Sequence, residues 1–137
     1  MAGDREAVNE SGGLRTDRLV MTWKVNGLLG RIKRGAVMRY LKRKGPAVAL
    51  LQETHLLGTK CSFLGRLGYD RVYHAGFTRG SRGAAILLHR SLTLTVGDSR
   101  WDPGGRFMVV WGLMEGRAYN LVSVYGPHSY RRRHLQI

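Results

Sequence analysis

The succession of a strand, a helix and a fully apolar strand constrains the fold of this sequence most. Residues 18–25, RLVMTWKV, have the pattern of a half-buried strand that ends at an Asn-Gly turn. Residues 31–44 place apolar side chains at helical spacing among many cations, and a Gly-Pro dipeptide ends the helix. Residues 47–52, AVALLQ, are typical of a strand that is buried on both faces. This order predicts a βαβ-like opening and the α/β class.

Strands dominate the rest of the sequence. Glycine-rich or polar turns separate further strand-like segments at 69–77, 83–89, 92–96, 106–114 and 118–126. Together they predict a mixed sheet with one main early helix. Such a sheet needs cover on both faces and one helix covers at most one, so we expect residues 18–137 to be part of a larger domain. The polar, aperiodic residues 1–17 are expected to form a disordered leader.

Basic side chains far outnumber acidic ones, with 23 Lys and Arg against nine Asp and Glu and a formal net charge of +14. A field of this sign favours polyanionic partners, first nucleic acid, then an anionic membrane surface or other acidic partners. No apolar run approaches the roughly 18 residues of a membrane span, so we expect DNA rather than a membrane as the partner. The lone Cys61 excludes an internal disulfide framework and fits a reducing, intracellular compartment.

Three polar residues stand where strands end, which is where α/β folds place reactive groups. Glu53 directly follows the apolar strand, and His55 projects to the same side if that strand continues. Tyr125 ends a later strand, just before a Gly-Pro turn. Each has a structural alternative: Glu53 could neutralise the basic turn near Lys24, His55 could be an exposed loop residue, and Tyr125 an ordinary strand-end tyrosine.

Several motifs in fixed order carry a family resemblance. WKVNGL, LLQETHL, RGAAILL, DPGGRFMVV and LVSVYGP follow one another in this order, within residues 18–134. The segment resembles the endonuclease/exonuclease/phosphatase family and is most similar to the LINE-type retrotransposon endonuclease domain, which is exonuclease III-like. The resemblance implies the amino-terminal half of a four-layer, DNase I-like α/β sandwich. It also implies a Mg²⁺-dependent hydrolase that nicks DNA, acts in the nucleus and uses no small-molecule cofactor.

The resemblance also implies roles for individual residues. Glu53 matches the metal-binding glutamate, and hard oxygen ligands of this kind suit Mg²⁺. Tyr125 matches the tyrosine whose phenol reaches the scissile phosphate. Asn26 matches the second polar residue of the first turn, and His55 the residue that LINE-type enzymes place near the site. These three are the expected catalytic residues.

Lys24 departs from the family pattern, because an asparagine is expected at this position. We expect Lys24 to form an ion pair with Glu53 that replaces and hinders the metal, or else to extend into solvent while its stem covers apolar surface. The later GDFN and Ser-Asp-His motifs have no counterpart before Ile137. We therefore expect this chain to be inactive by itself and to lack the carboxyl-terminal half of the domain.

The basic helix offers a further candidate site. Arg31, Lys33 and Arg34 are expected to contact nucleic-acid phosphates, the alternative being a solvated charged face. A non-catalytic, basic nucleic-acid-binding remnant is the second function that these patterns allow. A third retains the family and exchanges the substrate for an inositol phosphate or a sphingolipid phosphodiester.

Overall fold

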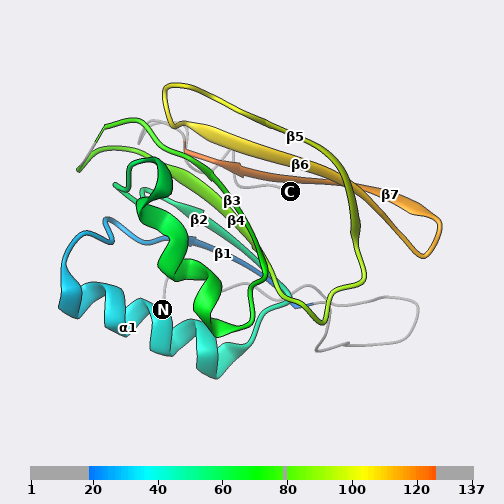
Figure 1. Ribbon diagram of the computed structural model, residues 1–137, viewed down its shortest axis with the longest axis horizontal. Coiled ribbons are helices and arrows are strands. Elements are labelled where there is room, and N and C mark those ends of the chain that lie inside the picture. The colour runs from blue at the N-terminus through cyan, green and yellow to red at the C-terminus, as the bar shows by residue number, and fades with distance from the viewer. Residues whose placement is uncertain (1–18, 79, 126–137) are drawn as a thin grey trace.

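The computed structural model describes residues 19–78 and 80–125 of the chain (Figure 1). One α-helix, one 3₁₀ helix and seven strands succeed one another there. They are β1 (Val20–Lys24), α1 (Arg31–Lys44), β2 (Val48–Gln52), η2 (Gly58–Leu67), β3 (Arg71–Ala75), β4 (Ala84–Leu88), β5 (Thr95–Trp101), β6 (Phe107–Met114) and β7 (Arg117–Val124).

The strands form two sheets. The first has the order β1-β2-β4-β3, and the second has the order β5-β6-β7. β1 and β2 are parallel and all other pairs are antiparallel, so the first sheet is mixed as predicted. Within the described residues, β1 has no neighbour on its outer edge. Figure 1 shows the sheets face to face, with α1 and η2 outside the first sheet, so three layers are present.

Burial on both faces of the central strands produces two cores. All five residues of β2 are buried, which confirms the prediction from the apolar run at 47–52, and all five residues of β4 are buried as well. Leu51 belongs to the core beneath α1, whereas Leu50 belongs to the core between the sheets. Side chains on β1 also alternate between the two cores. Met21 and Trp23 belong to the core beneath α1, and Val20 packs against the core between the sheets.

Helix α1 has the predicted bounds. Gly45 ends it in the left-handed conformation with φ 60°, and its N–H donates to the carbonyl of Leu41 at 2.8 Å. Three cations in the last turn, Lys42, Arg43 and Lys44, favourably oppose the partial negative charge of the helix terminus.

The fifth strand differs from its predicted position. The alternating segment 92–96 was expected to be a strand, but β5 begins only at Thr95 and runs to Trp101. Leu92 and Leu94 are buried as loop residues, and the guanidinium of Arg71 donates to both of their carbonyls, at 2.8 and 2.5 Å. Alternation here reflects burial without strand pairing. The 3₁₀ helix η2 was not predicted.

Two predictions fall outside the described residues: the leader at 1–17 and the continuation beyond Tyr125. Within the described part, no helix is both long enough and apolar enough to cross a membrane.

Candidate functional site

The carboxyl ends of β1, β2 and β7 lie at one edge of the molecule (Figure 1). Hydrogen bonding between the first two segments continues past the strands, because the Gly27 N–H donates to the Glu53 carbonyl at 2.6 Å. The Leu28 N–H then donates to the Thr54 carbonyl at 2.9 Å. Asn26 and Glu53 therefore leave their strands side by side.

A buried polar contact joins the end of β7 to the same edge. The side-chain amide of Gln52 donates to the Ser123 hydroxyl at 3.1 Å, and that hydroxyl donates to the Leu51 carbonyl at 2.7 Å. Tyr125 follows two residues later, held by its N–H, which donates to the Arg106 carbonyl at 2.7 Å. The edge thus gathers the four predicted site residues Asn26, Glu53, His55 and Tyr125.

Left-handed backbone conformations concentrate at this edge. Five described non-glycine residues have positive φ, and four of them lie here: Asn26 at 57°, Glu53 at 60°, His55 at 60° and Arg82 at 56°. Such conformations persist only where surrounding contacts impose them, and they often mark functional sites. The contacts here are backbone hydrogen bonds from Thr54 to Gly83 at 3.1 Å and from His55 to Arg82 at 2.7 Å.

His55 and Glu53 form a direct pair. Nε2 of His55 lies 2.7 Å from Oε1 of Glu53, with 24% and 15% of the two side chains exposed. The imidazole ring packs against the backbone of Gly27, where a Cβ atom would lie only 2.7 Å from Nδ1. A glycine at position 27 is therefore needed for the ring to reach the carboxylate.

A second histidine, His74, contacts the segment that holds Glu53 and His55. Nε2 of His74 on β3 lies 2.9 Å from the hydroxyl of Thr54, the buried residue between Glu53 and His55. Its Nδ1 atom is buried without a hydrogen-bond partner, and burial lowers the pKa of His74 to about 4. The ring is therefore neutral at pH 7. No sequence pattern singled out this residue, because a histidine within a strand has no characteristic spacing.

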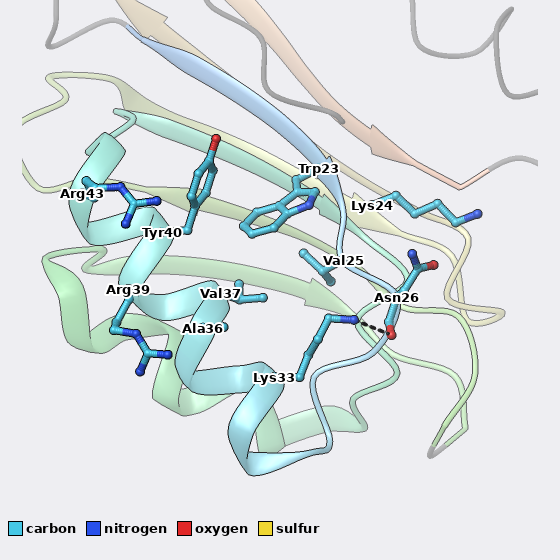
Figure 2. A pocket seen from close by; sticks show the side chains of 10 residues that line it. All are labelled: Trp23, Lys24, Val25, Asn26, Lys33, Ala36, Val37, Arg39, Tyr40 and Arg43. Atoms are coloured by element: carbon cyan, nitrogen blue, oxygen red, sulfur yellow. Dashed lines mark hydrogen bonds between the residues drawn. The ribbon is translucent and has the colours of Figure 1, made fainter. Parts of the chain in front are cut away.

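Lys24 does not pair with Glu53. Within the described residues no ion pair joins them, and Oε1 of Glu53 lies 2.7 Å from Nε2 of His55 instead. Figure 2 shows the lysine extending away from α1, past the end of β1. Its side chain is partly exposed and lines a surface pocket.

The three helix cations differ in their surroundings. The guanidinium of Arg34 donates to the carbonyls of Leu28 and Leu29 at 3.1 and 3.2 Å, and it lies 4.6 Å from the centre of the Phe63 ring. It therefore stabilises the loop that enters the helix. Lys33 is exposed and donates to the Asn26 carbonyl at 3.2 Å, and Arg31 is exposed.

The described residues do not complete a metal site. Across 19–78 and 80–125, no group of three or more His, Cys, Asp or Glu side chains could hold an ion. Mg²⁺ needs octahedral oxygen coordination, and Glu53 supplies one carboxylate whose Oε1 already accepts a hydrogen bond.

Comparison with solved structures identifies proteins of similar fold. No family model matches the sequence. The AP endonuclease LMAP from Leishmania major is similar at TM-score 0.61 and 20% identity, covering 95% of this chain and 48% of that one. The chain has the α/β fold of about half of this endonuclease.

Two other structures with this fold are also similar. A variant of the 3′ phosphatase NExo from Neisseria, bound to a product DNA hairpin, matches at TM-score 0.57 and 23% identity over 77% of this chain and 40% of that one. The human Nocturnin catalytic domain with a bound sulfate matches at 0.56 and 16%, covering 83% and 52%. The chain thus spans about half the length of these structures, as expected for part of a four-layer sandwich.

Proposed function

We propose that this chain is the amino-terminal half of a Mg²⁺-dependent phosphodiesterase that nicks DNA in the nucleus, similar to the LINE-type retrotransposon endonucleases. The observation that supports this most is the hydrogen-bonded pair of Glu53 and His55, set beside Asn26 at the edge where the strand before Tyr125 ends. An AP endonuclease and a 3′ phosphatase bound to product DNA have a similar fold.

The described residues would position a phosphodiester at this edge. A hydrogen bond from His55 fixes the orientation of the Glu53 carboxylate, which is partly open to solvent. The phenol of Tyr125 would donate to a phosphate oxygen, and the exposed Asn26 amide would hydrogen bond nearby. A bound Mg²⁺ would stabilise the charge that develops on the phosphate oxygens. The other metal ligands and the base that activates water would come from the carboxyl-terminal half of the domain.

A nicking assay on supercoiled plasmid with Mg²⁺ tests this proposal. We expect the chain alone to leave the plasmid intact. Fused to the carboxyl-terminal half of the Leishmania major AP endonuclease, it should nick in the presence of Mg²⁺, and a Glu53→Gln fusion should not. A folded, monomeric fusion without any nicking would contradict the proposal, as would robust Glu53-dependent nicking by the chain alone.

A second candidate function is non-catalytic binding of nucleic acid. The net charge of +14 favours it. This function requires binding that falls steeply with salt and is unchanged when EDTA replaces Mg²⁺. The first proposal requires Mg²⁺ to strengthen DNA binding by the active fusion, so this comparison separates the two.

A further inference from the structure

A basic pocket lies on the flank of the first sheet, between β1 and α1 (Figure 2). Its volume is about 550 Å³. The buried side chains of Trp23, Val25, Val37 and Tyr40 form its floor. Lys24, Asn26, Lys33, Ala36, Arg39 and Arg43 complete the lining. Since β1 has no outer neighbour in the described part, the pocket opens along a free strand edge.

All charged residues of the pocket are cations. None of Lys24, Lys33, Arg39 and Arg43 forms an ion pair with an acidic side chain within residues 19–78 and 80–125. Unopposed cations around a concave surface concentrate positive potential there and attract anions. The pocket is therefore suited to an anionic ligand that carries several charges.

Helical spacing aligns part of this rim. Arg39 and Arg43 are four residues apart on α1 and lie on neighbouring turns, while Lys33 stands near the start of the helix. Figure 2 shows Lys33 reaching toward Asn26, where the pocket meets the candidate site. Cations spread along a helix in this way match a chain of phosphates better than a single compact anion.

The aromatic side chains at the base of the pocket indicate which part of a nucleic acid could bind there. Trp23 and Tyr40 pack edge to face, with ring centres 4.9 Å apart, and only 9% and 8% of these residues are exposed. Their ring faces are therefore closed to stacking bases. Arg43 lies 5.2 Å from the centre of the Tyr40 ring, which holds its guanidinium at the rim. Contacts here would go to the backbone and would not read sequence.

We propose that this pocket binds the phosphodiester backbone of a nucleic-acid strand, through Arg39, Arg43, Lys24 and Lys33. The pocket extends away from the edge that holds Glu53. It would bind nucleic acid whether or not that edge hydrolyses a phosphodiester. The inference thus rests on the nucleic-acid binding named as the second candidate function, assigns it to a surface, and does not depend on hydrolysis.

Salt-dependent binding of a single-stranded 12-mer to the full chain tests the pocket. Arg39→Gln with Arg43→Gln removes two rim cations far along the helix from Glu53. The matched control, Arg90→Gln with Arg117→Gln, removes two exposed cations elsewhere. Each phosphate contact contributes about 0.7 to the slope of log affinity against log salt, so the pocket variant should lose about 1.4 and the control nearly nothing.

Equal loss of slope in the two double variants would overturn the inference, because binding would then follow net charge alone. Two competitors identify the ligand. Inorganic tripolyphosphate that binds as tightly as the 12-mer would show a small polyphosphate site instead. Poly-glutamate that binds as tightly and with the same dependence on Arg39 and Arg43 would show an acidic protein partner. Either result would replace the nucleic-acid backbone as the ligand, whereas weak competition by both supports it.

Discussion

Nε2 of His55 lies 2.7 Å from Oε1 of Glu53, although a single residue separates them in the sequence. Neighbours at this spacing on a straight strand project to the same side without such close contact. Left-handed conformations at both residues, each with φ 60°, bend the segment and bring the two side chains together. The pair therefore depends on backbone geometry that the surrounding loops maintain.

Replacing Gly27 should break that geometry. In Gly27→Ala, the new Cβ would lie 2.7 Å from Nδ1 of His55, at a backbone φ of 98°. We expect a loss of roughly 2 kcal/mol in the free energy of unfolding, measured by urea denaturation. Gly116→Ala is the control, because its φ of 78° is similarly strained but no atom lies within 4 Å. Equal losses for the two variants would show that contact with His55 contributes nothing.

Lys24 should weaken cation binding near Glu53 even without an ion pair. In Lys24→Asn, Mg²⁺ affinity measured by isothermal titration calorimetry should rise on the order of fivefold, because charge effects between partly exposed groups amount to about 1 kcal/mol or less. Lys33→Asn removes the same charge from an exposed helix position and should change the affinity less. Unchanged affinity in Lys24→Asn would remove this role.

Acid should destabilise the fold through His74. Burial lowers its pKa from 6.5 to about 4, so the unfolded chain binds a proton more readily than the folded one. The neutral His74 ring therefore contributes about 3 kcal/mol to the free energy of unfolding above pH 6.5, and this contribution is lost as the pH falls through 4. Urea midpoints across this range should fall less steeply in His74→Gln than in the wild type. Parallel curves for the two proteins would exclude His74 as the source.

The hydroxyl of Ser123 should couple the two sheets. Ser123→Ala removes the acceptor of the Gln52 amide and the donor to the Leu51 carbonyl, both in the buried interior. We expect a loss of about 1–3 kcal/mol in the free energy of unfolding. Ser99→Ala, in the outer strand β5, is the matched control and should lose much less. A neutral Ser123→Ala would mean that packing alone joins the sheets.

Local patterns predicted most of the first sheet. The bounds of α1 followed from helical spacing and a terminal glycine, and the burial of β2 followed from an uninterrupted apolar run. The prediction failed at 92–96, where the alternation of Leu92 and Leu94 has the same period as a strand. Periodicity reports burial, and only tertiary pairing decides whether a buried segment joins a sheet.

The candidate site was predicted in part for a similar reason. Strand ends placed Glu53, His55 and Tyr125 at the edge where the structure has them, and the family resemblance added Asn26. The partner of Glu53 was predicted to be Lys24, because spacing gives no sign of a left-handed φ at a glutamate. The support from His74 joins segments 20 residues apart, which no local pattern encodes.

Among residues 19–78 and 80–125, no strand pairs with the outer edge of β1, which has a consequence for solubility. Exposed strand edges invite pairing between copies, which is the first step toward aggregation. If two chains paired through β1, the cations that line the pocket beside each β1 would also come close together. Their repulsion would oppose this pairing. At 0.1 M salt, charges more than about 10 Å apart are largely screened from one another. The protein should therefore aggregate more readily as ionic strength rises.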